Sequence, residues 1–217
     1  MKESDLILVV RNDLDKKGFT TYGEVQMDKS DKRCDMYAVD YTDNHTIAFE
    51  AKTTLNIKVI EQAYYWQIYN QSNEVYVIVP YSKRNSKKRK FYKDIIEKLG
   101  IGLMEVDMYT KQIHIPFIST WNNKSKPPTL YEQQKHTVAS NSDNNYVTPF
   151  KITVENINNY MKDKTNENLS IVLSKIKHHY SNHKSAMGAI SEMIRRDVIK
   201  EYYLSKHKGR IFINKKI

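Results

Sequence analysis

The 217-residue chain has a single cysteine and no long run of apolar residues. One cysteine, Cys34, cannot form an internal disulfide framework, which excludes the disulfide-stabilised secreted class and fits a reducing cytoplasm. No stretch approaches the roughly 18 apolar residues of a membrane-spanning helix. The acidic start is followed by only a short apolar stretch at residues 6–10, which does not fit a secretory signal. We therefore expect a cytoplasmic protein with no membrane partner.

Positive charge is what the sequence has in excess, with a formal net charge of +10. Residues 1–147 hold 21 Lys or Arg against 19 Asp or Glu, a net of +2, whereas residues 148–217 hold 14 against 6, a net of +8. A small, strongly basic segment is typical of a domain that binds a polyanion, most often nucleic acid. A soluble surface with more lysine than usual is the alternative.

Hydrophobic periodicity predicts a first domain over residues 1–118 and a polar, turn-rich linker over 119–147. The order of elements in the first domain is helix, three strands, helix, strand, helix, and two closing strands. This order predicts an α/β fold with a mixed sheet flanked by helices on both faces. The expected elements are a helix through residues 6–14 that ends at Gly18, strands at 19–27, 34–41 and 45–53, a helix at 59–71, a strand at 75–79, a helix at 91–99 that ends at Gly100, and strands at 102–106 and 112–115.

The basic segment 148–217 is predicted to hold three short helices followed by a β-hairpin whose turn, residues 205–209, is basic and contains a glycine. This is the layout of a small winged helix-turn-helix domain, in which the helix before the hairpin enters the major groove and the hairpin tip touches the DNA backbone. A three-helix domain that does not bind DNA is the alternative. The expected helices are 154–162, 169–180 and 186–196, and the expected strands are 202–204 and 210–213. The candidate DNA contacts are Arg195, Arg196, Lys206, Lys208 and Arg210.

Two acidic residues and a lysine fall on neighbouring predicted strands. Period-two alternation in the segment 45–53 sends Phe49 to one face of the strand and Glu50 and Lys52 to the other. Asp35 lies on the preceding strand. Two nearby carboxylates suit a hard divalent cation, which prefers oxygen ligands. An adjacent lysine can orient or deprotonate a water and offset charge on a phosphoryl group, so the pattern indicates metal-assisted phosphodiester hydrolysis.

This combination resembles the PD-(D/E)XK nuclease superfamily, which has the restriction-endonuclease-like fold, over roughly residues 5–117. The matching residues are Asp35 on one strand and the Glu-x-Lys triplet of Glu50 and Lys52 on the next. Glu24 lies upstream, where the family often adds an acidic residue to the metal site. Gln62 lies on the following predicted helix, where the family often carries a glutamine that faces the site. The proline that names the motif is absent here.

The resemblance implies a role for each of these residues. Asp35 and Glu50 would bind Mg²⁺ or Mn²⁺, with the backbone carbonyl of Ala51 and with Glu24 as further ligands. Lys52 would position the attacking water. The glutamine on the helix would contact the site or the phosphate.

Each of these assignments has a structural alternative. Asp35 and Lys52 can form a cross-strand ion pair that contributes little. Glu24 can be a solvated strand residue, and Gln62 a solvated amide on a helix surface. Trp66, with the aromatic residues beside it, is expected to pack against the sheet rather than to stack on bases.

A basic run at residues 83–90, in which six of eight residues are cationic, precedes the helix 91–99. It can clamp phosphates beside the cleft through Lys87, Lys88 and Arg89. A solvated loop and first helical turn is the alternative.

The function expected from the sequence is a Mg²⁺- or Mn²⁺-dependent DNA endonuclease of the restriction, mobile-element or phage kind. A catalytically inactive or partner-dependent DNA-binding protein, such as a regulator or a TnsA-like transposase subunit, is the second hypothesis. An RNA-directed enzyme is the third. DNA is the expected partner, and a homodimer or a larger nucleoprotein assembly is compatible with double-strand cleavage.

Overall fold

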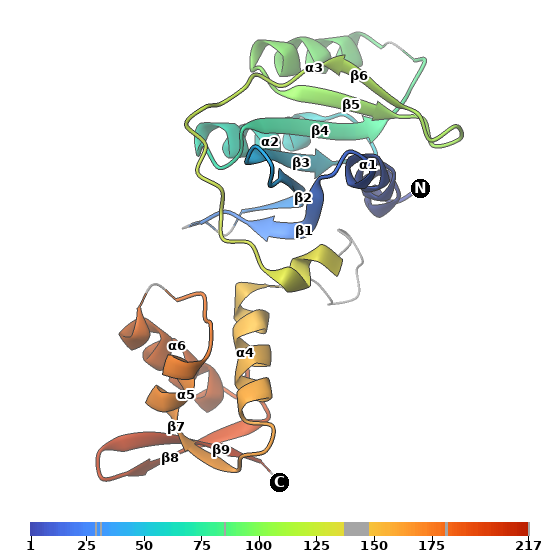
Figure 1. Ribbon diagram of the computed structural model, residues 1–217. Coiled ribbons are helices and arrows are strands. Elements are labelled where there is room, and N and C mark those ends of the chain that lie inside the picture. The colour runs from blue at the N-terminus through green and yellow to red at the C-terminus, as the bar shows by residue number, and fades with distance from the viewer. Residues whose placement is uncertain (29, 31, 85, 137–147, 181, 217) are drawn as a thin grey trace. The chain divides into compact units, whose positions relative to one another are not determined.

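The computed structural model describes residues 1–28, 30, 32–84, 86–136, 148–180 and 182–216. The chain divides into two compact units between residues 146 and 147 (Figure 1). The division lies at the end of the segment expected to be a linker. None of the helices in these residues is long and apolar enough to cross a membrane.

The first unit is built on a six-stranded mixed sheet with the strand order β1-β2-β3-β4-β5-β6. The β3–β4 and β4–β5 pairs are parallel, and the other pairs are antiparallel. The elements are α1 (Glu3–Lys16), β1 (Thr20–Gln26), β2 (Arg33–Asp40), β3 (His45–Ala51), α2 (Ile57–Ile68), β4 (Glu74–Pro80), α3 (Lys87–Lys98), β5 (Gly102–Val106), β6 (Ile113–Phe117) and the 3₁₀ helix η1 (Glu132–His136).

Helices cover both faces of this sheet, as the sequence predicts (Figure 1). The apolar face of α1, centred on Leu6 and Val10, packs against Phe49 and its neighbours on one side. On the other side, α2 and α3 pack through residues such as Trp66 and Ile96. The alternation in β3 therefore places Ile47, Phe49 and Ala51 under α1, and Ala48 and Glu50 on the side of α2.

The helix ends agree with the sequence to within a few residues. α1 and α3 are followed by Gly18 and Gly100, whose φ values of +87° and +68° lie in the left-handed region that glycine adopts without strain. In the first unit, the largest difference is at the start of α3, which begins at Lys87 rather than at residue 91. The Ser86 side chain caps the helix by accepting a hydrogen bond from the Arg89 N–H. Half of the basic run therefore forms the first turn of this helix.

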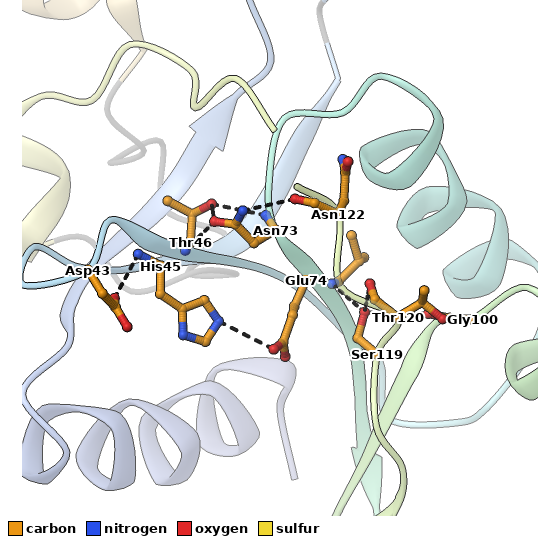
Figure 2. Close-up of polar contacts among 10 residues, drawn as sticks. Asp43, His45, Thr46, Asn73, Glu74, Gly100, Ser119, Thr120 and Asn122 are labelled. Carbon is orange, nitrogen blue, oxygen red and sulfur yellow. Dashed lines mark hydrogen bonds and ion pairs between the residues drawn. The ribbon is translucent and has the colours of Figure 1, made fainter. Parts of the chain in front are cut away.

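Residues 119–136 lie against the first unit instead of forming a free linker; residues 137–147 lie outside the described residues. Figure 2 shows the polar contacts that hold the start of this segment. Asn73 accepts hydrogen bonds at Oδ1 from the backbone N–H (2.9 Å) and the hydroxyl (2.8 Å) of Thr46, and its Nδ2 donates to the carbonyl of Asn122 (2.9 Å). Ser119 Oγ accepts from the Val75 N–H at 3.0 Å. These bonds tie the segment to the end of the sheet where β3 and β4 begin.

The second unit has three helices and a three-stranded antiparallel sheet with the order β7-β9-β8. Strand β7 was not expected from the sequence, because three polar residues, Asn-Glu-Asn, carry no strand signal. α5 is also shorter than expected, since the chain becomes extended at Ile176. The core of the second unit includes Ile157, Leu173, Ile190 and Ile213. The elements are α4 (Pro149–Tyr160), β7 (Asn166–Asn168), α5 (Leu169–Lys175), α6 (His183–Arg195), β8 (Tyr202–His207) and β9 (Arg210–Lys215).

The hairpin turn between β8 and β9 consists of two residues, Lys208 and Gly209. Their φ values are +46° and +79°, and His207 pairs with Arg210 across the turn. Positive φ at both central residues is the geometry that matches the twist of the flanking strands, and glycine meets it without cost. The turn is therefore shorter than the expected 205–209, because β8 continues through His207.

Candidate active site and nucleic-acid-binding surfaces

Strands β2 and β3 separate at the position of Asp35. Their ladder ends with the pair Met36 and Phe49. Beyond that pair, the Ala51 N–H donates to the Asp35 carboxylate (N–Oδ2, 2.7 Å) instead of to a backbone carbonyl. A side chain thus replaces a strand–strand hydrogen bond and holds the Asp35 carboxylate at the end of β3.

Glu50 lies beside this point on the α2 face of the sheet. It is only 1% exposed, and its Oε2 atom is buried with no hydrogen-bond partner. The indole N–H of Trp66, on α2, approaches the Glu50 carboxyl group from the helix side and acts to lower the pKa of that group. Its geometry falls short of a full hydrogen bond, so Trp66 Nε1 is also buried without a partner. A buried carboxylate oxygen without a donor is costly, so this atom needs a further positive or donor group to be satisfied.

Both carboxyl groups resist ionisation. Burial, opposed by the Ala51 hydrogen bond and by the charge of Lys52, raises the pKa of Asp35 to about 6. Burial and the charge of Asp35 raise the pKa of Glu50 well above its ordinary value. A buried carboxylate that lies beside a second carboxylate is stabilised in its charged form by a bound cation.

Lys52 lies one residue past the end of β3, and its side chain turns toward the first turn of α1. Its Nζ atom is 3.0 Å from Glu3 Oε2. Partial burial alone would lower the pKa of Lys52, but the hydrogen bond to Glu3 and the charges of Asp35 and Glu50 outweigh it and raise the pKa. Lys52 is therefore a cation at neutral pH, which fits it to donate to a water or a phosphate oxygen rather than to remove a proton.

Glu24 lies opposite Asp35 on β1. The β1–β2 register is continuous on both sides of these two residues, but they do not pair with each other. Glu24 has a φ of +54°, which a non-glycine residue adopts only at a cost of about 1 kcal/mol. Its carboxylate is 4.0 Å from the Arg33 guanidinium, and its carbonyl accepts a hydrogen bond from the buried Gln134. Its charge contributes to the raised pKa of Asp35.

The structure brings some predicted site residues together and leaves one apart. Asp35, Glu50 and Lys52 gather at one end of β2 and β3. Gln62 is exposed on α2, and no hydrogen bond links its side chain to another described residue. Trp66, one turn later, occupies the position beside Glu50 that the sequence suggested for Gln62.

Two site residues, Glu3 and Trp66, carried no functional signal in the sequence. In the sequence, the acidic start of α1 indicates only that the segment does not fit a signal peptide. Trp66 was predicted to pack against the sheet, which it does, with its ring centroid 5.7 Å from that of Tyr37.

The donor chemistry at this site fits a hard divalent cation. Asp35, Glu50 and the backbone carbonyl of Ala51 offer oxygen ligands, and the buried Glu50 Oε2 has no other partner. Over the residues that the structure describes, no three His, Cys, Asp or Glu side chains form a metal-binding group. Glu24 therefore does not complete a three-carboxylate site with Asp35 and Glu50, and the candidate donor set is a carboxylate pair.

The basic run differs from the sequence expectation at Arg89. Its guanidinium pairs with the buried Glu105 on β5 and donates to the Pro80 carbonyl at 3.2 Å. Lys93 pairs with the same carboxylate at 2.9 Å. Arg89 is thus held by the fold, whereas Lys87 and Lys88 are exposed.

The predicted DNA contacts of the second unit are all exposed. Lys206, Lys208 and Arg210 lie on the β8–β9 hairpin, and no ion pair joins them to another residue in the described part of the chain. Arg195 and Arg196 end α6 and share Glu192, at 3.8 Å and 2.7 Å. Within the described residues, the hairpin cations therefore lack an acidic partner, whereas the two arginines of α6 share one.

No family model, no curated protein and no solved structure matches this chain.

Proposed function

We propose that the protein is a divalent-metal-dependent DNA endonuclease of the PD-(D/E)XK type, with Asp35, Glu50 and Lys52 as its hydrolytic residues. The observation that carries this proposal is the carboxylate pair at the separated ends of β2 and β3. There, Glu50 Oε2 is buried without a partner and Lys52 is held as a cation nearby. The strand order and the helices on both faces of the sheet support the restriction-endonuclease-like fold.

The reaction is hydrolysis of a phosphodiester bond: the oxygen of a water bonds to phosphorus, and the bond to the leaving oxygen breaks. Asp35 and Glu50, with the Ala51 carbonyl, would hold Mg²⁺ or Mn²⁺. The bound ion would place positive charge against the phosphate oxygens and lower the pKa of a neighbouring water. Lys52 donates a hydrogen bond to the attacking water or to a phosphate oxygen and offsets the developing negative charge. The Ala51 N–H fixes the orientation of Asp35.

The second unit is proposed to supply DNA affinity as a winged helix. The order of its helices and strands supports this assignment, with α6 before the β8–β9 hairpin. The exposed Lys206, Lys208 and Arg210 give the hairpin a cationic tip suited to the DNA backbone.

The test is cleavage of supercoiled and linear DNA by the full chain in Mg²⁺ or Mn²⁺. Glu50→Gln and Lys52→Ala are expected to abolish product, while Gln62→Ala retains activity because this side chain lies apart from the site. Cleavage that survives both Glu50→Gln and Lys52→Ala would sink the assignment. A parallel binding assay compares the wild type with a Lys206→Ala/Lys208→Ala variant, which is expected to bind DNA more weakly.

A partner-dependent DNA-binding protein is the second candidate. The Lys52–Glu3 ion pair favours it, because the lysine that should face the substrate is held by α1 in the free chain. Metal-dependent DNA binding without cleavage of any DNA form would support this second function over the first.

A further inference from the structure

A groove of about 420 Å³ opens where β3 and β4 end. Thr53 and Thr54 line it from the segment after β3, and Ser82 and Arg84 line it from the segment after β4. Thr53 directly follows Lys52 in the chain, so the groove adjoins the candidate active site. Its volume is in the range of pockets that hold small ligands, and it has room for a phosphate with its attached sugar.

The charged side chains that line this groove are all cationic: Arg84, Lys88 and Arg89. The charge of Arg89 is matched by the buried Glu105. Arg84 and Lys88 form no ion pair within the described residues, and both are exposed. The groove therefore carries two positive charges that no acidic residue in the described part of the chain neutralises.

The charge of the adjoining helix turn adds to this field. The first turn of α3 is the run Lys87, Lys88, Arg89 and Lys90, and it contains no acidic residue. The N-terminus of a helix is its positive end, so cations are unfavourable there and anions are favourable. Arg89 is compensated by Glu105, but no ion pair is found for the three lysines of this turn within the described residues. Cations in this position oppose the helix dipole, a pattern expected where a ligand supplies the compensating charge.

We propose that this groove is a phosphate subsite that holds the sugar-phosphate backbone of the substrate next to the bond that is cut. Arg84 and Lys88 contact the phosphate oxygens, and the hydroxyls of Thr53 and Ser82 donate to them. The choice of a nucleic-acid substrate rests on the proposed nuclease function, whereas the positive charge and the shape are properties of the groove alone.

The phosphate can come from two positions in a nucleic acid. An internal phosphodiester would be bound by an enzyme that cuts within a strand, and a terminal 5′-phosphate by one that works from an end. Both present the same oxygens, and the test separates them.

The experiment measures binding of a fluorescein-labelled DNA duplex to the full chain by anisotropy in EDTA, over a series of salt concentrations. The variants are the double Arg84→Ala/Lys88→Ala and, as a matched control, Lys90→Ala. Lys90 is exposed in the same helical turn and carries the same charge, but it does not line the groove. Each duplex is prepared with a 5′-phosphate and with a 5′-hydroxyl end.

The double variant is expected to reduce the slope of log K against log salt by about 2, since each lost phosphate contact contributes about 0.9, while Lys90→Ala stays near the wild type. A terminal site predicts a preference for the 5′-phosphate that the double variant abolishes; an internal site predicts that the end chemistry has no effect. The proposal is overturned if the double variant keeps the wild-type slope, or if Lys90→Ala changes it equally. Because binding is measured without metal, absence of cleavage would remove the proposed hydrolysis and leave this result intact.

Discussion

Replacing Asp35 by Asn is predicted to stabilise the metal-free protein at neutral and alkaline pH. The substitution removes the charge and keeps an oxygen that can accept the 2.7 Å hydrogen bond from the Ala51 N–H. An ionised Asp35 destabilises the folded, metal-free protein, and a bound cation would offset this destabilisation. The uncharged carboxamide of Asn avoids this destabilisation but cannot hold the cation.

The size of the effect follows from the pKa of Asp35, raised from 3.8 to about 6. Between these two values the folded state binds more protons than the unfolded state, so the free energy of unfolding falls as the pH rises. Two units correspond to about 3 kcal/mol, and the partial solvent exposure of Asp35 reduces this to about 1–3 kcal/mol. The advantage of Asp35→Asn is therefore expected to be full near pH 8 and to shrink by about half or more near pH 4.5.

Urea unfolding in EDTA, followed by tryptophan fluorescence, measures this difference. Both tryptophans, Trp66 and Trp121, lie in the first unit, so the signal reports on that unit alone. Asp107→Asn is the control, because backbone hydrogen bonds from Tyr109 and Thr110 outweigh burial and lower the pKa of Asp107. This variant should therefore not be stabilised at high pH.

The same measurement in Mg²⁺ completes the test. The wild type should gain stability with increasing Mg²⁺ by mass action, and Asp35→Asn should not. An Asp35→Asn protein that is no more stable than the wild type near pH 8 in EDTA, or that gains equally from Mg²⁺, would refute the account of the site.

Three further predictions follow from particular contacts. Glu105→Gln should lower the free energy of unfolding, measured by urea denaturation, by about 2–4 kcal/mol, because it leaves the guanidinium of Arg89 without its buried charged partner. Glu24→Gly should raise the free energy of unfolding by up to about 1 kcal/mol, since glycine adopts the φ of +54° without strain. Trp66→Phe should lower metal-dependent cleavage about 10-fold by removing the N–H beside Glu50, whereas Gln62→Ala should leave cleavage nearly unchanged in the same assay.

The α/β class of the first unit, with its mixed sheet between helices, and the carboxylate pair could be predicted from the sequence because their signals are local. Alternation along β3 fixes which face each residue takes, and it correctly placed Phe49 and Glu50 on opposite faces. Gly18 and Gly100 likewise marked the helix ends through their own conformational freedom. Such signals need no knowledge of which other element lies nearby.

The residues that complete the site depend on distant neighbours and could not be predicted in this way. Alternation no longer sets the direction of Lys52, because β3 ends at Ala51, and the contact of Lys52 with Glu3 requires the position of α1. On α2, Gln62 lies at the margin of the apolar stripe and points to solvent, while Trp66 lies within that stripe. The counter-ion of Arg89 comes from β5, so no local pattern could show that this cation is already paired.

The two ends of the sheet in the first unit differ in their charged groups, and this contrast favours one end as the place where the proposed chemistry occurs. At the end where β3 and β4 begin, Asn73 bonds through both its oxygen and its nitrogen, and the fold supplies every partner in that exchange (Figure 2). At the opposite end, Glu50 has a buried oxygen without a partner, Glu24 has a strained backbone, and α3 begins with cations against its dipole. Selection for stability alone would remove such features one by one. A cation and a polyanion bound at this end would supply the charges that Glu50 and the first turn of α3 leave unmatched.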